Sequence, residues 1–317
     1  MTDLRFDKLC AWLEDFFADE NFVITQASDD ASFRRYFRVE RNNASFIAMD
    51  APPDKEDSKP FVSIGNYLRS HAIHTPKIIE TNLDQGFLLL EDLGDQTFLK
   101  AQQANPNLEH YKKAIDILIQ FHTLEIKADF IPAYSQTLLN TEMQLLIDWY
   151  LPKLSTQQQA QLAKLFDLLS NNALNTTQVF VHRDFHSRNL MLLNDNSLGV
   201  IDFQDAVVGS YVYDLVSLLK DAYFELDTES INELLHYFYQ TANVSSSFEA
   251  FEKQFDLMGL QRHLKILGIF KRLSIRDGKH QYLQNIPLIE KYVFQIADKY
   301  TNFSYLKDML NLTEASQ

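Results

Sequence analysis

Apolar residues recur every three or four positions between residues 4 and 17, which predicts an amphipathic helix near the start of the chain. Short apolar runs of strand length follow it. A segment rich in proline and charge, residues 50–60, interrupts these runs and precedes a second helical pattern at residues 61–71. We therefore expect about five strands and two helices in residues 1–93.

The apolar spacing becomes mainly helical beyond residue 93. Helical period extends over residues 108–124, 141–154, 157–171, 231–242 and 248–275. Two short strand-like runs lie among them, at residues 190–193 and 198–203. A chain of 317 residues is long for one hydrophobic core, so the shift predicts two lobes. We expect an α+β fold with a small β-rich lobe at residues 1–93 and a larger, mainly helical lobe at residues 94–317.

The charge and cysteine content narrow the possible partners. A net charge of −14 disfavours nucleic acid or an anionic membrane as the main partner, because phosphate groups need a cationic surface. It permits a nucleotide held through a metal ion. The single cysteine, Cys10, excludes an internal disulfide and a cysteine-based zinc site. The apolar runs are strand-sized and the acidic N-terminus lacks a signal-peptide pattern, so a cytoplasmic location fits.

Two polar motifs accompany the strand-like runs of the second part of the chain. The tripeptide His-Arg-Asp at residues 182–184 is followed by Asn189, and Asp202 begins the tripeptide Asp-Phe-Gln thirteen residues after Asn189. We expect the first motif to lie between the helical core and a strand. The order and spacing are those of the kinase catalytic loop, H-R-D-x-x-x-x-N, and of the metal-binding D-F-G motif.

The residue types in these motifs suit phosphoryl transfer, which needs positioning and charge neutralisation more than covalent help from the protein. Asp184 can accept the proton of an attacking hydroxyl. Asn189 and Asp202 offer the hard oxygen atoms that Mg²⁺ prefers. Aspartate and asparagine are also common in ordinary polar turns. Two motifs in this order and spacing favour the catalytic interpretation.

Three segments carry a family resemblance: "SDDASFRRYFRV" at residues 28–39, residues 181–221, and residues 261–279. They resemble the aminoglycoside phosphotransferase branch of the protein-kinase-like superfamily, and within it the bacterial anomeric kinases of N-acetylmuramate and N-acetylglucosamine. The resemblance implies a two-lobed protein-kinase-like fold, the cofactors ATP and Mg²⁺, and an amino sugar phosphorylated on its anomeric hydroxyl in cell-wall recycling. Two alternatives stay open: a kinase of another small alcohol, such as an aminoglycoside, and a nucleotide-binding pseudokinase that serves as a scaffold. The oligomeric state is not indicated.

The resemblance also implies how the nucleotide is held. Backbone groups around Glu91 and Leu93 would form a hinge and face the adenine. Ser28, Ala31 and Ser32 would allow backbone N–H groups to approach the phosphates, although this loop contains no glycine. The alternative for this loop is an ordinary hairpin turn.

One departure from the kinase pattern concerns the phosphate anchor. Asp50 stands where protein kinases carry a lysine, and the helix predicted next contains no acidic partner. Since both halves of the usual ion pair are absent together, another cation would have to take the role. The candidates are Arg34, Arg35, Arg38, Lys55 and Lys59. We favour Arg35, with a solvated strand face as the alternative for the arginine cluster.

The remaining polar residues of the two motifs receive supporting roles. Arg188 could offset negative charge in the transition state, and His186 could contact the substrate or a phosphate. Asp205 could contact the sugar or cap the next turn. His182 and Asp214 are expected to support the loop structurally.

The third resembling segment bears on the substrate. Four cationic residues and one isoleucine step by three and four along one face of its predicted helix: Arg262, Lys265, Ile269, Arg272 and Arg276. A cationic face on an acidic chain favours an anionic acceptor such as N-acetylmuramate over a polycationic aminoglycoside. A solvated face that pairs with the chain's own carboxylates is the alternative. His263 is a further candidate for binding sugar hydroxyls.

Overall fold

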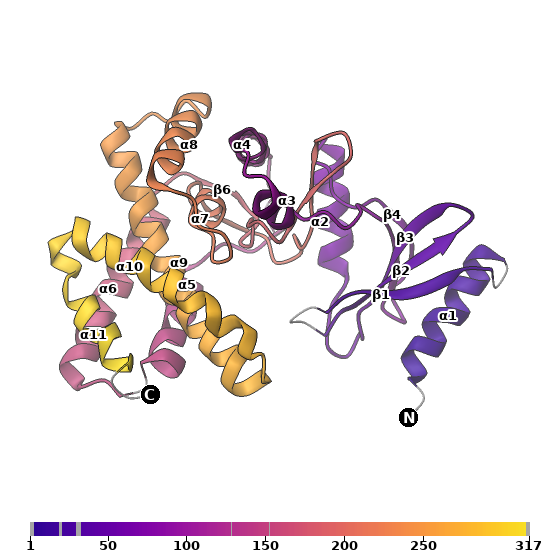
Figure 1. Cartoon of the computed structure of the whole chain (residues 1–317), viewed down its shortest axis with the longest axis horizontal. Helices are drawn as coiled ribbons and strands as arrows, with labels where there is room; N and C mark the ends of the chain where they lie inside the picture. Colours follow the sequence, from indigo (N-terminus) through magenta and orange to yellow (C-terminus); the bar gives the residue numbers. More distant parts are fainter. Residues whose placement is uncertain (1–2, 19–20, 30–32, 128, 152, 315–317) are drawn as a thin grey trace. The chain divides into compact units, whose positions relative to one another are not determined.

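The computed structural model describes residues 3–18, 21–29, 33–127, 129–151 and 153–314. It contains two compact units (Figure 1). The first comprises Met1–Gln96 with Met191–Asp205, and the second comprises Thr97–Leu190 with Ala206–Gln317. A β-rich part and a larger helical part are what the sequence predicts. The division at residues 93 and 94 stays a prediction, because compact packing does not by itself define the lobes.

The first unit is built on one antiparallel sheet with the strand order β1-β2-β3-β5-β4. Its strands are β1 (Val23–Asp29), β2 (Arg35–Arg41), β3 (Ala44–Asp50), β4 (Ile78–Asn82) and β5 (Phe87–Glu91). Helix α1 (Leu4–Phe17) has the predicted bounds. It places Leu9 and Leu13 in the core with apolar side chains of the sheet, including Val39 and Leu89. The expected five strands and two helices are confirmed, since α2 (Lys59–Ser70) is the second helix.

Helix α2 supports the segment that carries the second polar motif. The rings of Phe61 and Phe203 lie 4.9 Å apart. A Cβ atom at Gly65 would lie 2.9 Å from Cζ of Phe203, so this position needs glycine. Strands β7 (Leu190–Leu192) and β8 (Leu198–Val200) form a two-stranded sheet, and the Val200 N–H donates to the His74 carbonyl at 2.8 Å. These contacts fix the backbone that leads into Asp202.

The second unit is mainly helical. Its α-helices are α3 (Phe98–Ala104), α4 (Leu108–His122), α5 (Gln136–Leu145), α6 (Thr156–Leu174), α7 (Tyr213–Leu219), α8 (Thr228–Thr241), α9 (Phe248–Asp277), α10 (Ile286–Lys299) and α11 (Tyr305–Glu314), with short 3₁₀ turns at His280–Asn285 and Thr301–Phe303. No helix in the described part of the chain is long and apolar enough to cross a membrane.

The helix predicted over residues 141–154 is interrupted in the structure. Helix α5 ends at Leu145, and a π-helical turn spans Leu146–Tyr150. Helix α9 approaches the backbone at this junction, because a Cβ atom at Gly268 would lie 2.3 Å from the carbonyl carbon of Leu145. The long helix can pass this point only where a residue has no side chain.

A strand precedes the first polar motif. Strand β6 (Gln178–Val181) pairs antiparallel with β9 (Val207–Ser210). The motif lies between the strands β6 and β7, so the expectation of a strand after it holds and the expectation of the helical core before it is wrong. A run of four residues is too short for periodicity to distinguish a strand from a helix end.

Candidate active site

The loop that follows β6 is fastened at its start by Asp214, in the first turn of α7. The Asp214 carboxylate accepts hydrogen bonds from the N–H groups of His182 and Arg183 at 2.6 and 3.0 Å. Arg183 has φ of 77°, a left-handed conformation that needs such support. Burial raises the pKa of Asp214 to about 7. His182 is fully buried and its Nδ1 accepts from the Asp184 N–H at 3.3 Å, so the structural roles expected for His182 and Asp214 are confirmed.

A second buried carboxylate, Asp221, fastens the other half of the loop. It accepts hydrogen bonds from the N–H groups of Ser187 at 2.9 Å and Tyr223 at 3.0 Å. The Arg188 guanidinium carbon lies 3.8 Å from the centre of the Tyr223 ring, and the His186 ring lies edge-on to the same ring at 5.2 Å. One carboxylate therefore sets both the loop and the aromatic ring against which Arg188 lies.

Asp184 is ionised at neutral pH. Burial alone would raise the pKa of its carboxyl group, but electrostatic interactions with the cation Lys265 and with His186, Arg262 and Arg183 outweigh burial and lower the pKa to about 2. So acidic a group is a weak base at neutral pH. It can accept a hydrogen bond from an acceptor hydroxyl, and it is better suited to orienting that hydroxyl than to removing its proton before attack.

Asn189 is oriented by the same loop. Its Nδ2 donates a hydrogen bond to the Asp184 carbonyl at 3.0 Å, and its N–H donates to the His186 carbonyl at 2.9 Å. The amide nitrogen faces the loop, and the amide oxygen is the atom of this side chain that could coordinate a cation.

A buried ionic cluster lies beside the loop. Glu142, on α5, is 7 % exposed and lies 2.8 Å from Nζ of Lys265 and 2.5 Å from Nη2 of Arg183. The Tyr134 hydroxyl donates to the same carboxylate. Lys265 also donates to the Tyr213 hydroxyl at 3.2 Å. The cluster fixes Lys265, whose charge lowers the pKa of Asp184, and it ties α5 and α9 to the loop.

The cationic face of α9 is buried along part of its length. Arg262 is 4 % exposed and Lys265 is 7 % exposed, so the solvated-face alternative is wrong for these two residues. Arg262 donates from Nε to the Ser217 hydroxyl at 2.6 Å. Arg276, at the exposed end of the helix, pairs with Asp277 at 2.8 Å. The middle of the helix lies in the core and its end lies at the surface. The helical spacing of the cationic residues could not predict this difference.

His263 has structural contacts in the core. It is fully buried, its Nε2 lies 3.1 Å from the Lys220 carbonyl, and its ring stacks on Tyr292 at 4.9 Å. Burial lowers its pKa to about 3, so the ring is neutral. Its predicted contact with sugar hydroxyls stays a prediction, and the observed packing favours a structural role.

Asp202, in the first unit, has a left-handed backbone with φ of 65°. Its side chain is 35 % exposed, and Oδ1 accepts a hydrogen bond from Nε2 of Gln204 at 2.8 Å. The same Gln204 amide lies 3.3 Å from the exposed Asp205 carboxylate. Nη1 of Arg34 lies 3.6 Å from Oδ1 of Asp202. A partly exposed carboxylate held in a strained turn can serve as a metal ligand once its cationic neighbour is displaced.

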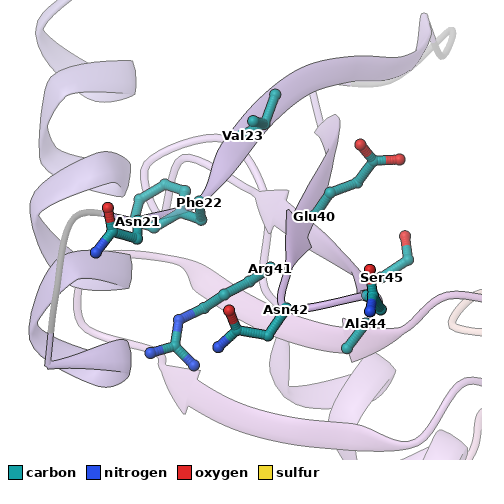
Figure 2. A pocket seen from close by; sticks show the side chains of 9 residues that line it. Asn21, Phe22, Val23, Glu40, Arg41, Asn42, Ala44 and Ser45 are labelled. Carbon is teal, nitrogen blue, oxygen red and sulfur yellow. The ribbon is translucent and has the colours of Figure 1, made fainter.

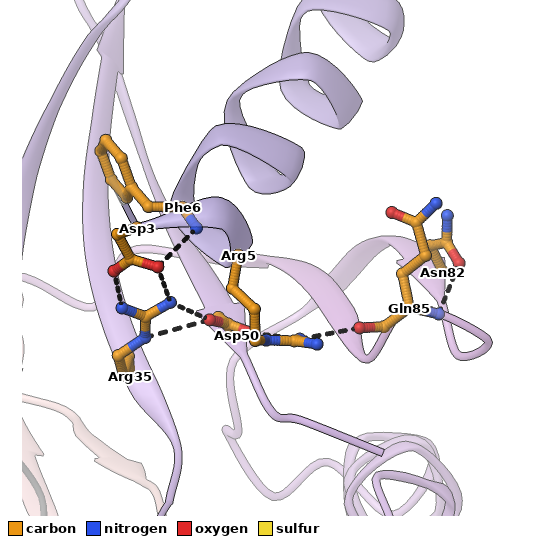
Figure 3. Close-up of polar contacts among 7 residues, drawn as sticks. All are labelled: Asp3, Arg5, Phe6, Arg35, Asp50, Asn82 and Gln85. Carbon is orange, nitrogen blue, oxygen red and sulfur yellow. Dashed lines mark hydrogen bonds and ion pairs between the residues drawn. The ribbon is translucent and has the colours of Figure 1, made fainter. Parts of the chain in front are cut away.

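Asp50 is the centre of a structural ion-pair cluster (Figure 3). Its carboxylate is fully buried, and Figure 3 shows the side chains of Arg5 and Arg35 converging on it. Arg5 Nε lies 2.9 Å from Oδ1, and Arg35 Nη2 lies 2.5 Å from Oδ2. Arg35 also pairs with Asp3, at the start of α1. The aspartate at the expected lysine position thus joins α1, β2 and β3, and it engages the guanidinium favoured above as the phosphate anchor.

The predicted hinge is held by side-chain contacts within the first unit. The Glu91 carboxylate accepts hydrogen bonds from the Lys77 N–H at 3.0 Å and from Arg69 Nη1 at 3.1 Å. Leu93 packs closely on Gly199, where a Cβ atom would lie 2.7 Å from its Cδ1. These contacts hold the backbone of the predicted hinge in place.

The predicted phosphate loop lies only in part within the described residues. Ala31 and Ser32 lie outside the described residues. The backbone of Ser28 belongs to β1, at an irregularity in its pairing with β2. The expected backbone approach to phosphate stays a prediction.

An open pocket of about 660 Å³ lies in the first unit and is lined by residues 21–23 and 40–45 (Figure 2). It surrounds the hairpin between β2 and β3, whereas Arg35 and Asp50 pair at the other ends of these strands. None of the predicted site residues lines this pocket.

Comparison with known proteins identifies the class of enzyme. Residues 23–245 match the phosphotransferase enzyme family, and the chain belongs to this family. It is an ATP-dependent phosphotransferase. Two solved structures support the kinase-like fold. Choline kinase LicA from Streptococcus pneumoniae has a TM-score of 0.66 and 12 % sequence identity, and the match covers 92 % of this chain and 99 % of that chain. Aminoglycoside phosphotransferase APH(2'')-Ib with ADP has a TM-score of 0.62 and 17 % sequence identity, and the match covers 90 % of this chain and 97 % of that chain.

Curated relatives are more similar in sequence. The N-acetylmuramate/N-acetylglucosamine kinase of Pseudomonas aeruginosa is 40 % identical over 92 % of this chain and 91 % of its own length. The protein of the same name from Neisseria meningitidis serogroup B is 35 % identical over 96 % of this chain and 94 % of its own length. The family expected from the three resembling segments is confirmed.

Proposed function

We propose that the protein transfers the γ-phosphoryl group of ATP to the anomeric hydroxyl of N-acetylmuramate and N-acetylglucosamine, in cell-wall recycling. The observation that carries the proposal is the loop from His182 to Asn189, in which Asp184 is kept ionised and Asn189 is oriented by the loop backbone. The high identity to kinases named for these two sugars supports the choice of acceptor.

Asp184 would orient the acceptor hydroxyl and receive its proton as the bond to phosphorus forms. Arg188, whose guanidinium lies over the Tyr223 ring, would present its N–H groups to the negative charge of the transition state. The positions of both residues follow from the two carboxylates that fasten the loop, Asp214 and Asp221.

Asn189 and Asp202 would hold Mg²⁺, since both supply the oxygen atoms that this ion prefers. When bound, the ion would neutralise phosphate charge. The described residues contain no group of three or more His, Cys, Asp or Glu side chains that could hold a metal by themselves. An ion held by these two residues would therefore need further ligands from phosphate oxygens and water.

Arg262 is the residue we favour for the lactyl carboxylate of N-acetylmuramate. It is buried and acts on Asp184 electrostatically. Lys265 and Arg276 of the same face pair with Glu142 and Asp277, whereas no carboxylate among the described residues lies within ion-pair distance of Arg262. Asp184 and Asp221 interact with Arg262 electrostatically without forming an ion pair, so its guanidinium can still pair with a ligand carboxylate. His186 and Asp205 are the proposed contacts to sugar hydroxyls.

A panel of acceptors tests the proposal against its alternatives. ATP turnover should rise on addition of N-acetylmuramate or N-acetylglucosamine, and should stay at the background rate with choline, homoserine and kanamycin. Turnover stimulated by one of the latter compounds alone would identify a different small-alcohol kinase. Nucleotide binding without turnover on any acceptor would favour the pseudokinase scaffold.

A further inference from the structure

Arg34, the residue before β2, lies between two carboxylates of the first unit. Its guanidinium is 3.3 Å from Oε2 of Glu56 and 3.6 Å from Oδ1 of Asp202. The side chain is only 10 % exposed. Glu56 is also held in place, because Oε1 accepts a hydrogen bond from the Phe33 N–H at 3.3 Å. The cation is therefore fixed next to the carboxylate that we assign to the metal.

The other candidate cations are committed elsewhere or exposed. Arg35 is engaged by Asp50 and Asp3. Arg38 is engaged by Asp92 at 2.7 Å and Asp95 at 2.6 Å. Lys55, whose side chain is 52 % exposed, lies 3.6 Å from Asp54. Lys59, at the start of α2, is exposed. Among these candidates, and within the part of the chain that the structure describes, Arg34 alone lies within ion-pair distance of a proposed metal ligand.

Glu56 supplies the acidic partner that the sequence of α2 lacks. It lies three residues before the helix begins at Lys59, and it pairs with a cation from the start of β2. The ion pair that protein kinases build from the third strand and the next helix thus has a counterpart made from different positions. Asp50 is free to serve the structural cluster with Arg5 and Arg35.

We propose that Arg34 is the phosphate anchor and that it exchanges partners: it neutralises Asp202 before the nucleotide binds, and it moves to the phosphates as the metal takes Asp202. The inference rests on the metal role assigned to Asp202 under the proposed function. A guanidinium favours the multiple oxygens of a phosphate over one carboxylate oxygen at 3.6 Å, and Mg²⁺ favours the carboxylate. Glu56 would keep the guanidinium aligned during the exchange.

The exchange predicts effects of opposite sign when Arg34 is replaced by glutamine. Without its cation, Asp202 should bind Mn²⁺ more tightly in the absence of nucleotide, by about three- to tenfold, measured by electron paramagnetic resonance of free Mn²⁺. The affinity for Mg²⁺–ATP should fall by about 10- to 100-fold in titration calorimetry, because a charge-assisted phosphate contact is lost. The affinity for adenosine should not change.

Arg41→Gln is the matched control, since it removes the same charge from the far end of β2. Arg34→Lys keeps the charge without the planar fork, so its affinity for ATP should lie between wild type and Arg34→Gln, which keeps the test informative if the glutamine variant fails to fold. The proposal would be overturned if either Arg34 variant kept the ATP affinity of the wild type. It would also be overturned if the affinity for adenosine fell as much as the affinity for ATP, or if Mn²⁺ bound more weakly without nucleotide. These titrations use no sugar, so a wild type that binds ATP but phosphorylates no amino sugar would contradict the proposed function alone.

Discussion

Asp184→Asn is expected to reduce sugar-dependent ATP turnover by about 10²- to 10⁴-fold while the protein stays folded. The replacement has nearly the same shape but cannot receive the proton of the acceptor hydroxyl, and it removes the negative charge that the surrounding cations stabilise. The loop should keep its conformation, because its backbone is fastened by the carboxylates of Asp214 and Asp221, not by the side chain of Asp184.

The measurement compares ADP release with and without N-acetylglucosamine, together with the melting temperature and the ATP affinity of the variant. Asp167→Asn, on the exposed side of α6, is a control for the same chemical change away from the loop. Turnover close to wild type in Asp184→Asn would exclude Asp184 from the mechanism. Equal losses of turnover and melting temperature would assign it a structural role.

Glu142→Leu is expected to lower the free energy of unfolding by about 3–5 kcal/mol, because it leaves the buried Lys265 without its carboxylate. Lys265→Met combined with Glu142→Leu should recover part of this loss, since the buried charge and its partner are then removed together. Arg183 keeps the recovery incomplete, because it also pairs with Glu142.

Urea unfolding of the wild type, both single variants and the double variant gives the coupling free energy between the two residues. The matched control is Lys112→Met, which removes a lysine that pairs with Glu109 and Glu233 at the surface. This variant should lower the free energy of unfolding by no more than about 1 kcal/mol. Strictly additive losses from Glu142 and Lys265 would show that the two side chains do not stabilise each other.

The spacing of apolar and polar residues in the sequence was enough to predict individual helices and the catalytic motif. The bounds of α1 match the apolar spacing, and the spacing of Asp184, Asn189 and Asp202 indicates phosphoryl transfer. The spacing did not identify the pairs of residues that lie far apart in the sequence and contact each other in the structure. Asp221 contacts Ser187, and Glu142 contacts Lys265, across long stretches of sequence.

Signals for some of these partners exist in the sequence. Glu142 is an acidic residue on the apolar face of α5, between the buried Leu139 and Met143, and such a position implies a buried cation elsewhere. Asp221 stands directly after an apolar helical run, in the segment that resembles the sugar kinases. Neither signal says which residue is the partner, because that depends on how the helices pack.

The arginine cluster shows the limit of such reasoning most clearly. Arg34 and Arg35 are adjacent, and adjacent residues near a strand point to opposite faces. Arg35 faces Asp50 and Asp3, whereas Arg34 faces Glu56 and Asp202. The sequence could not show which arginine faces which carboxylates, because the partner carboxylates come from distant segments: β3, α1 and the segments around Glu56 and Asp202.

Phosphorus NMR of the reaction product shows which hydroxyl group of the sugar receives the phosphoryl group. The protein is incubated with ATP, Mg²⁺ and N-acetylmuramate or N-acetylglucosamine, and the proton coupling of the new phosphate signal is recorded. We expect a sugar phosphate whose phosphorus couples to the single anomeric proton. Coupling to the methylene protons or to another ring proton, or the absence of any sugar phosphate while ATP binds, would contradict the proposed function.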